Sequence, residues 1–574
     1  QRRARVMFKF KELVEANKQE LAELLSSEHG KVVDDAHGDV QRGLEVIEYA
    51  CGIPQALKGE YTQGAGPGID VYSMRQPLGI GAGITPFNFP AMIPMWMFGM
   101  AIAAGNAFIL KPSERDPSVP IRLAELFVEA GAPEGLLQVV NGDKEMVDAI
   151  LDHEDIAAVS FVGSSDIAHY VYKRGVAAGK RVQAMGGAKN HGIVMPDADL
   201  DQVVNDLAGA AFGSAGERCM ALPVVVPVGE DTADRLREKL IPAINALRVC
   251  ISTDKDAHYG PVVTPEHRAR IEQWIDTAEK EGAEVVIDGR GFSLQGHEDG
   301  FFVGPTLLDR VTTDMESYKE EIFGPVLQIV RAKDFEDAVR LPSEHQYGNG
   351  VAIFTRNGHA AREFAHRVNV GMVGINVPIP VPVSYHSFGG WKRSAFGDTN
   401  QTLWVVDVDS GKTTQIDRSK RNDITDYTWS PDSQWLAYTK VENTGYSSIF
   451  AHQLDNNKTH RLTSAAFTDF SPVFGSNGNH LFFLSNRDYN LAFSSYEFNY
   501  LYNNATRVYA ARLNNDAEAL YPFEGASSDA KKADDKDQKD KKVVVKIETE
   551  GFDNRVRALP GNASNYNNLQ TNGD

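Results

Sequence analysis

The chain has few cysteines and no long apolar run. Only three cysteines, Cys51, Cys219 and Cys250, occur in 574 residues. That count is too low for a disulfide framework and favours a reducing compartment, so we expect a cytoplasmic protein. The longest apolar stretch, 91–110, is interrupted by proline, glycine and asparagine. It is too broken for a membrane span, and the first residues lack the apolar run of a signal peptide.

Positive charge is also scarce. The chain has 58 Lys and Arg against 78 Asp and Glu, which gives a formal net charge of -20. Such an acidic chain is a poor candidate for binding nucleic acid or an anionic membrane. Its length allows several domains that each bury their own core, so no stabilising metal is expected. The acidic balance is better explained by solubility.

One cysteine lies in a run of small residues, Phe212–Leu222, which reads FGSAGERCMAL. Small residues let backbone approach backbone, so the Cys219 thiol could act there as a nucleophile. A free thiol is only a few per cent ionised at pH 7 and reacts faster beside a positive charge, which Arg218 could supply. The alternative is that Cys219 is an ordinary buried apolar residue.

Apolar strand-like runs alternate with helical patterns over 78–376, which predicts a parallel sheet with helices on both faces. Lys111 and Glu114 directly follow one such run, at the strand end where open α/β sheets bind ligands. A carboxylate there could accept both ribose hydroxyls of adenosine and would repel a 2'-phosphate, which favours NAD over NADP. Gly163 and Ser164 lead into a helix whose N–H groups could bind a pyrophosphate, although the usual G-x-G-x-x-G pattern is missing.

Several motifs occur in a fixed order: TPFNFP (85–90), KPSE (111–114), FVGS (161–164), GERC (216–219), EEIFGPV (320–326) and FGG (388–390). Together they resemble the aldehyde dehydrogenase superfamily over residues 1–398. The details MGGAKNH (185–191), AGERCMA (215–221) and SFGGWKRS (387–394) look like its CoA-acylating methylmalonate-semialdehyde dehydrogenases.

The resemblance implies a Rossmann-like α/β fold. It implies an NAD-binding domain over 1–187 with an oligomerisation hairpin at 57–75, a catalytic domain over 188–386, and a return to the cofactor domain at 387–398. It also implies a dimer or tetramer. Because the family starts several tens of residues earlier, we expect that its amino-terminal part is absent here.

The resemblance also assigns roles to residues. Cys219 would be the nucleophile, and Asn88 with the Cys219 N–H would stabilise the oxyanion. Arg42 and Arg218 would bind a substrate carboxylate, although Arg42 could instead be a solvated helix residue. Glu321 would bind the nicotinamide ribose and Phe323 would pack on the ring, or Phe323 could be an ordinary core aromatic. The implied NAD-binding set is Thr85, Phe87, Lys111, Glu114, Gly163, Ser164, Glu321 and Phe323.

Ala184 stands where hydrolytic members of the superfamily carry the glutamate that activates water. Without a general base, water is a poor nucleophile toward the acyl-enzyme, and a CoA thiol could take the acyl group instead. The expected reaction is NAD-dependent oxidation of methylmalonate or malonate semialdehyde to propionyl-CoA or acetyl-CoA with loss of carbon dioxide. A hydrolytic enzyme that uses Glu217 as base is an alternative.

After residue 398 the family pattern ends and a repeat of about 45 residues begins. Leu403–Thr413 is echoed by Ile449–Thr459, and Trp429–Tyr438 by Phe474–Phe483. This spacing is typical of β-propeller blades, and the segment resembles the propeller region of tricorn-type peptidases. We expect an incomplete all-β propeller over 399–525, with two blades and a fraction that includes 507–513.

The remaining sequence has little pattern. Residues 526–542 are rich in Lys and Asp and are expected to be flexible, and 543–574 are expected to form an irregular tail. The junction at Asp398–Thr399 has no linker and cuts both patterns short. It suggests an artificial fusion or an assembly error that joins two unrelated fragments. A non-catalytic chimera whose propeller fragment binds peptides is therefore a further alternative.

Overall fold

The protein, seen here as a computed structural model, divides into two compact units, Gln1–Asn400 and Gln401–Asp574, and each is described by itself. The structure describes residues 1–66, 69–397, 402–406, 413–419, 424–442, 446–487, 491–494, 499–502, 506–518, 520, 543–562, 564, 566 and 569. The predicted junction at 398–399 and the charged segment 526–542 lie outside these residues. Over the described residues, the helices are too short or too polar to span a membrane.

A six-stranded sheet forms the first half of unit 1, in the order β17-β7-β6-β3-β4-β5. Its strands are parallel except β17, which runs antiparallel to β7. The bounds are β3 (Ile80–Ile84), β4 (Ala107–Lys111), β5 (Leu137–Val139), β6 (Ile156–Val162), β7 (Arg181–Met185) and β17 (Ala395–Gly397).

Helices cover both faces of this sheet, as the alternating pattern predicts. One apolar cluster joins β4 to α5 (Met92–Ala103) and α6 (Ser118–Glu129), together with the amino-terminal helices. A second cluster joins β6 and β7 to α7 (Lys144–Asp152) and α8 (Ser165–Ala177). The doubly covered sheet leaves its strand ends free for ligand binding.

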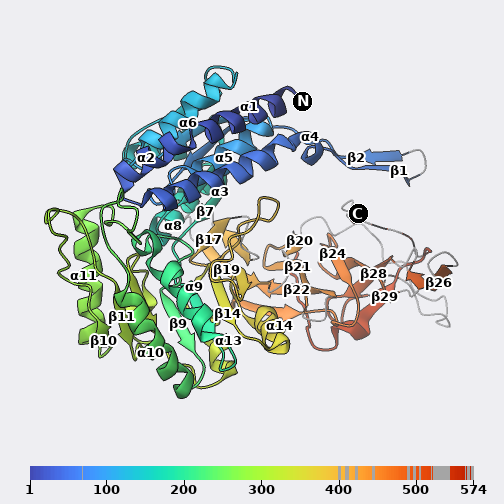
Figure 1. The fold of residues 1–574 in the computed structure, drawn as a ribbon. Coiled ribbons are helices and arrows are strands. Elements are labelled where there is room, and N and C mark those ends of the chain that lie inside the picture. The colour runs from blue at the N-terminus through green and yellow to red at the C-terminus, as the bar shows by residue number, and fades with distance from the viewer. Residues whose placement is uncertain are drawn as a thin grey trace, which may run out of the picture. The chain divides into compact units, whose positions relative to one another are not determined.

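The amino-terminal helices are α1 (Arg2–Ala16), α2 (Lys18–His29), α3 (Val33–Cys51) and α4 (Ile53–Ala56). Met7, Phe10 and Val14 of α1 recur at helical spacing and are buried. Beyond α4, β1 (Tyr61–Gly66) and β2 (Ile69–Tyr72) form an antiparallel hairpin that extends away from the helices (Figure 1). Tyr61, Val71 and Tyr72 of this hairpin are exposed, with Tyr72 at 67%.

A seven-stranded sheet forms the second half of unit 1, in the order β10-β11-β12-β9-β8-β14-β15. Only β10 runs antiparallel to its neighbour among these described strands. The strands are β8 (His191–Val194), β9 (Val224–Pro227), β10 (Glu284–Ile287), β11 (Thr306–Asp309), β12 (Val326–Ile329), β14 (Gly350–Phe354) and β15 (Met372–Ile375). The helices are α9 (Leu200–Phe212), α10 (Glu230–Asn245), α11 (Pro265–Lys280), α12 (Glu316–Lys319), α13 (Phe335–Glu344) and α14 (Gly358–Arg367), and β13 (Tyr347–Gly348) pairs with β16 (Trp391–Lys392).

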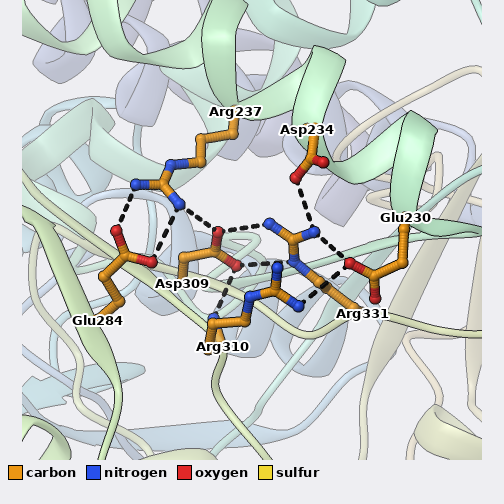
Figure 2. A network of polar contacts seen from close by, with 7 residues as sticks. All are labelled: Glu230, Asp234, Arg237, Glu284, Asp309, Arg310 and Arg331. Atoms are coloured by element: carbon orange, nitrogen blue, oxygen red, sulfur yellow. Dashed lines mark hydrogen bonds and ion pairs between the residues drawn. The ribbon is translucent and has the colours of Figure 1, made fainter.

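A network of seven charged residues joins α10 to this sheet (Figure 2). Its centre is the fully buried carboxylate of Asp309 at the end of β11. The Asp309 Oδ2 atom lies 3.0 Å from Arg237 Nη1 and 2.8 Å from Arg331 Nη2. Glu230, Asp234, Glu284 and Arg310 complete the network. Arg331 and Arg237 hold the pKa of Asp309 below its usual range, against the effect of its burial.

The second unit contains two four-stranded antiparallel sheets, β20-β21-β22-β23 and β24-β25-β28-β29. Each has the meander order of a propeller blade. Two strand pairs, β18–β19 and β26–β27, accompany them. The bounds are β18 (Thr402–Val406), β19 (Thr413–Arg418), β20 (Thr425–Trp429), β21 (Trp435–Val441), β22 (Ser447–Gln453), β23 (Lys458–Arg461), β24 (Asp469–Phe474), β25 (His480–Ser485), β26 (Leu491–Ser494), β27 (Asn499–Tyr502), β28 (Arg507–Arg512) and β29 (Val556–Ala558).

The backbone of the second unit repeats with the sequence. Asp426 and Ser471 have φ of 53° and 52°, and Ser433 and Gly478 have φ of 59° and 72°. Both pairs are separated by 45 residues, and the Ser471 N–H donates to the Asp426 side chain between the two sheets. The predicted 45-residue repeat therefore corresponds to one blade.

Two predictions about the end of the chain need correction. The sequence predicts 507–513 in a third, partial blade, but β28 pairs with β25 inside the second blade. It also predicts an irregular tail, but β29 pairs with β28, and Val545 and Phe552 are buried in the same apolar cluster. The β26–β27 hairpin lies in sequence between β25 and β28, and more than 40 residues separate β28 from β29, so the 45-residue spacing is lost there.

Candidate active site

The turn before Cys219 is held in a strained conformation. After α9, the residues Ser214, Ala215 and Gly216 have φ of 51°, 53° and 73°. The left-handed region is unfavourable for residues that carry a Cβ and is often found at functional sites. A Cβ at position 216 would lie 2.2 Å from the Gly324 carbonyl oxygen, so only glycine fits there. The turn thus packs directly against the loop that carries Glu321 and Phe323.

The Cys219 thiol lies beside the predicted oxyanion donor. Asn88 Nδ2 lies 3.5 Å from Cys219 Sγ and donates to the Glu217 carbonyl at 3.0 Å. The Cys219 carbonyl accepts from the side-chain amides of Asn190 and Asn349, at 2.9 and 3.0 Å. Burial raises the pKa of the thiol, and the Asn88 amide opposes that rise. The structure therefore brings the two predicted catalytic residues together.

A cavity of about 760 Å³ opens in front of the thiol. Arg42 and Arg218, the two predicted carboxylate-binding residues, both line it together with Cys219. Much of the remaining wall is apolar and comes from α5, including Trp96 and Met97. Mostly apolar walls with a few charged groups are typical of small-molecule sites.

Both arginines have carboxylate partners. Arg218 Nη2 lies 2.7 Å from Asp35 Oδ1, and the guanidinium rests against Gly213, where a Cβ would lie 2.7 Å from Arg218 Nη1. Arg42 Nη1 lies 2.5 Å from Glu45 Oε2. The sequence predicts that Arg218 supplies the positive charge next to the thiol. In the structure, the cation that lowers the pKa of Cys219 is instead the buried Lys31.

Four of the predicted cofactor residues follow the carboxyl ends of adjacent parallel strands. Because β3 pairs with both β4 and β6, Thr85, Lys111 and Gly163 come together at one edge of the sheet. The Thr85 N–H donates to the Lys111 carbonyl at 3.0 Å. Ser164 is the residue before the first turn of α8, where unpaired N–H groups attract anions.

Glu114 lies at the same edge and is exposed. Its Oε2 atom lies 3.1 Å from Lys111 Nζ, and its side chain is 56% exposed while Lys111 is buried. Partial burial works against the charged form, but a backbone N–H and the Lys111 ammonium hold the pKa of Glu114 below its usual value. An ionised, accessible carboxylate at a strand end could accept ribose hydroxyls.

Phe87 and Phe323 pack edge to face with ring centroids 6.0 Å apart. Phe323 has φ of 56°, an unusual conformation for an aromatic residue. Glu321, two residues earlier, accepts from the Ala188 N–H at 2.9 Å, and burial raises its pKa to about 7. A Cβ at position 187 would lie 2.3 Å from Glu321 Oε2, so the Gly-Gly step makes room for this carboxylate.

The sequence did not reveal His267, which links the turn that carries Glu217 to the loop that carries Phe323. Its Nε2 donates to the Phe323 carbonyl at 2.7 Å, and its Nδ1 accepts from Arg270 at 3.2 Å. Because an arginine only donates and a carbonyl only accepts, these partners define the neutral tautomer. Its place at the start of a helix, after a Thr-Pro pair, gives a capping signal but no sign of this role.

Glu217 is fully buried and points away from the cavity. Its Oε1 atom accepts from the Val263 N–H at 3.3 Å and lies 3.3 Å from His267 Nε2. Its Oε2 atom makes no hydrogen bond to any described residue. Burial raises the pKa of this carboxyl to about 8, so it is mostly protonated at neutral pH.

Ala184 is buried in the apolar cluster beneath α8. Its strand neighbours Gln183 and Met185 line the cavity, as expected when side chains alternate along a strand. Among the described residues, position 184 therefore adds no polar group to the cavity. The described side chains also include no cluster of three metal ligands.

An α/β fold with a cysteine thiol that lines a cavity, near an open edge of parallel strands, is an arrangement expected of a nucleotide-dependent oxidoreductase. The pattern of the aldehyde dehydrogenase family matches residues 1–408, more than half of the chain. The chain belongs to the aldehyde dehydrogenase family, and an oxidation of the aldehyde dehydrogenase type follows from this membership. The pattern of the tricorn protease second beta propeller domain matches residues 390–573, so 390–408 fall in both matches.

The names of individual relatives are more specific than the name of the family. A malonate-semialdehyde dehydrogenase of Pseudomonas aeruginosa is 57% identical over 397 residues, which cover 69% of this chain and 80% of that protein. A mitochondrial, acylating methylmalonate-semialdehyde/malonate-semialdehyde dehydrogenase of Bos taurus is 48% identical over 398 residues, covering 69% of this chain and 74% of that protein.

Two solved structures share the fold with TM-scores of 0.69. One, from Oceanimonas doudoroffii, is a methylmalonate-semialdehyde dehydrogenase that is 58% identical and covers 69% of this chain and 81% of its own. The other, from Sinorhizobium meliloti, is assigned as a methylmalonate-semialdehyde dehydrogenase and is complexed with NAD. It is 63% identical and covers 74% of this chain and 86% of its own.

Proposed function

We propose that the chain catalyses NAD-dependent, CoA-acylating oxidation of malonate or methylmalonate semialdehyde. The observation that carries the proposal is the Cys219 thiol, which lies 3.5 Å from the Asn88 amide in a cavity lined by Arg42 and Arg218. The names of the relatives above support the same substrates.

Cys219 would act as the nucleophile. Its thiolate adds to the aldehyde carbonyl and forms a thiohemiacetal, whose oxyanion lies within reach of Asn88 Nδ2 and the Cys219 N–H. One such donor contributes on the order of 3 kcal/mol to the lowering of a barrier. The amides of Asn190 and Asn349, which hold the Cys219 carbonyl, keep the main chain of the nucleophile fixed.

Arg42 and Arg218 would recognise the carboxylate of the semialdehyde. Each guanidinium has five N–H donors, and Asp35 and Glu45 use only some of them. A charge-assisted bond to either arginine would select a substrate that carries a carboxylate one or two carbons from the aldehyde. Once the aldehyde carbon is a thioester, the bond between that carboxylate and the α-carbon would break, carbon dioxide would leave, and the electron pair that stays on the α-carbon as an enolate would take up a proton.

The described residues fit a dinucleotide. Glu114 is exposed beside Lys111, the start of α8 has free N–H groups next to Ser164, and Phe87 and Phe323 form an aromatic pair near the Glu321 carboxylate. When bound, NAD would accept a hydride from the thiohemiacetal carbon. We propose that residues 1–187 with 387–398 hold the cofactor, and that 188–386 supply the nucleophile.

CoA rather than water would release the acyl group from Cys219. Deacylation by water needs a general base, and the nearest candidate in sequence, Glu217, has a pKa of about 8 and faces Val263 and His267. A CoA thiol loses its proton to solvent near neutral pH without such a base, and the resulting thiolate adds to the thioester carbonyl. The bond from the acyl carbon to the CoA sulfur forms, the bond to the Cys219 sulfur breaks, and the Cys219 thiolate leaves.

Product analysis with and without CoA tests this proposal. The purified chain is incubated with NAD and malonate semialdehyde, and NADH, carbon dioxide and acyl products are measured. We expect acetyl-CoA and carbon dioxide in amounts equal to NADH, with turnover that depends on CoA. NADH formation that ignores CoA and yields free acid would favour the hydrolytic alternative. A folded chain whose Cys219 resists aldehyde-like electrophiles would favour the non-catalytic chimera.

A further inference from the structure

A buried lysine lies behind the proposed oxyanion donor. Lys31 lies two residues before the first residue of α3 and is only 1% exposed. Its Nζ atom donates to the Asn88 carbonyl at 2.6 Å and lies 3.3 Å from Asp39 Oδ2. It also lies 4.1 Å from the ring centroid of Phe89. A buried ammonium is costly unless it is paired, so three partners around one lysine point to a specific role.

Through Asn88, this lysine is one residue away from the thiol. The Asn88 carbonyl is held by Lys31, and the Asn88 side-chain amide lies 3.5 Å from Cys219 Sγ. Asp39, the partner of Lys31, also accepts from the Met92 N–H at 2.7 Å. Lys31 therefore fixes the main chain at Asn88, within the TPFNFP motif, and Asp39 fixes it at Met92, two residues after the motif. Together the two contacts set the direction of the Asn88 amide.

The other charges around the thiol are offset or negative. Arg218 is paired with Asp35, and Arg42 with Glu45. Glu321 raises the pKa of Cys219, whereas Lys31 lowers it. The titratable groups that surround the thiol or Lys31 are His29, Asp35, Asp39, Arg42, Asp116, Glu217, Arg218 and Glu321.

We propose that Lys31 is a positioning residue of the catalytic centre, which fixes Asn88 against Cys219 and provides the buried positive charge that favours the thiolate. This inference rests on the proposed role of Cys219 as nucleophile. It adds a residue that touches neither substrate nor reacting atoms, at the start of a helix for which the sequence suggests only Arg42.

Alkylation of Cys219 by iodoacetamide between pH 6 and 10 tests the inference without substrate or cofactor. The rate is followed by mass spectrometry of the peptide that contains Cys219, because Cys51 and Cys250 are also free thiols. In Lys31→Met we expect the midpoint of the pH profile to rise and the rate at pH 7.5 to fall at least about threefold. Lys31→Arg keeps the charge and should recover most of the rate.

Two further variants separate this role from a structural one. Lys9→Met removes a positive charge from an exposed lysine and should leave the profile unchanged. Lys31→Met/Asp39→Asn removes both buried charges, so it folds if Lys31→Met alone fails because Asp39 is left unpaired. A wild-type midpoint in folded Lys31→Met, or in folded Lys31→Met/Asp39→Asn, would overturn the inference. If wild-type Cys219 itself does not react, the proposed function fails instead.

Discussion

Unit 1 buries two carboxylates in opposite ways. Asp309 has Arg237, Arg331 and the Arg310 N–H around it and stays ionised, with a lowered pKa (Figure 2). Glu217 has one N–H at 3.3 Å, and its pKa is raised to about 8. The same chemical group is thus a paired anion in one region and a neutral acid in the other, because of its neighbours alone.

The difference between Asp309 and Glu217 distinguishes a region that stabilises the fold from a region proposed to carry out the reaction. Around Asp309 each buried charge has a partner, which is expected of a region that only holds α10 to the sheet. Around Cys219 the described structure keeps a strained turn, and the Glu217 Oε2 atom and the His29 ring lie 3.9 Å apart without a hydrogen bond. Local features that cost stability cluster where the family carries out its reaction.

The largest expected effect would come from Cys219→Ser. Because a serine hydroxyl is almost un-ionised at neutral pH, we expect the rate of NADH formation to fall at least about 10⁴-fold, roughly 5 kcal/mol of barrier. The midpoint of thermal unfolding should stay within a few degrees of wild type. Turnover within tenfold of wild type would show that Cys219 is not the nucleophile.

The opposite result is expected for Asp309→Ala. Removing the carboxylate leaves the side chains of Arg237 and Arg331 without their shared partner, so unfolding should become easier by about 3–5 kcal/mol. The rate per folded molecule should not change. Denaturant unfolding and active-site titration of the same sample measure both quantities.

Asp309→Asn is the matched control, because it keeps the shape and removes only the charge. The wild-type carboxylate has a lowered pKa, so its stabilisation is complete above the unfolded pKa near 4 and is lost as the pH falls through the folded value. The asparagine variant should therefore lose less stability than wild type on acidification. Equal acid sensitivity would show that the network is not what keeps α10 in place.

Smaller changes are expected from Arg218→Gln. It would remove the proposed charge-assisted contact between Arg218 and the substrate carboxylate, so kcat/KM for malonate semialdehyde should fall about 10–100-fold, or about 1.4–2.7 kcal/mol. Propionaldehyde, which has no carboxylate, should be affected less than about threefold. Arg235→Gln, at an exposed arginine of α10, controls for loss of charge. Equal losses for both aldehydes would assign Arg218 to the turn rather than to the substrate.

Much of the fold was predictable because its signals are local. Alternating apolar runs gave the parallel strands, and the 45-residue repeat gave the blades. The motifs gave Cys219 and Asn88, which the structure brings to 3.5 Å from each other. The second blade was misread because an insertion separates β25 from β28, and spacing carries no information across an insertion of unknown length.

The partners of the charged residues could not be predicted in the same way. Asp35 and Arg218 are 183 residues apart in sequence, and Lys31 and Asn88 are 57 apart. From sequence alone, a single Lys or Asp is interpreted as a solvent-exposed residue, because its contact partner is known only once the fold is known. The only available signal was the spacing of Asp35, Asp39 and Arg42, which places three ionisable residues on one face of an amphipathic helix.

Glu217→Gln is expected to change turnover least, and it tests the contrast with Asp309 most directly. Since the folded pKa is near 8 and the unfolded value near 4.5, the folded state keeps a proton that the unfolded state loses between these values. The free energy of unfolding of the wild type should therefore fall as the pH rises through this window, by on the order of 1 kcal/mol or more. The glutamine variant should not show this pH dependence. Turnover should remain within about twofold of wild type, because a neutral acid cannot serve as base. A loss above 100-fold, with acyl-enzyme accumulating in the absence of CoA, would identify Glu217 as the base and remove the distinction between the two carboxylates.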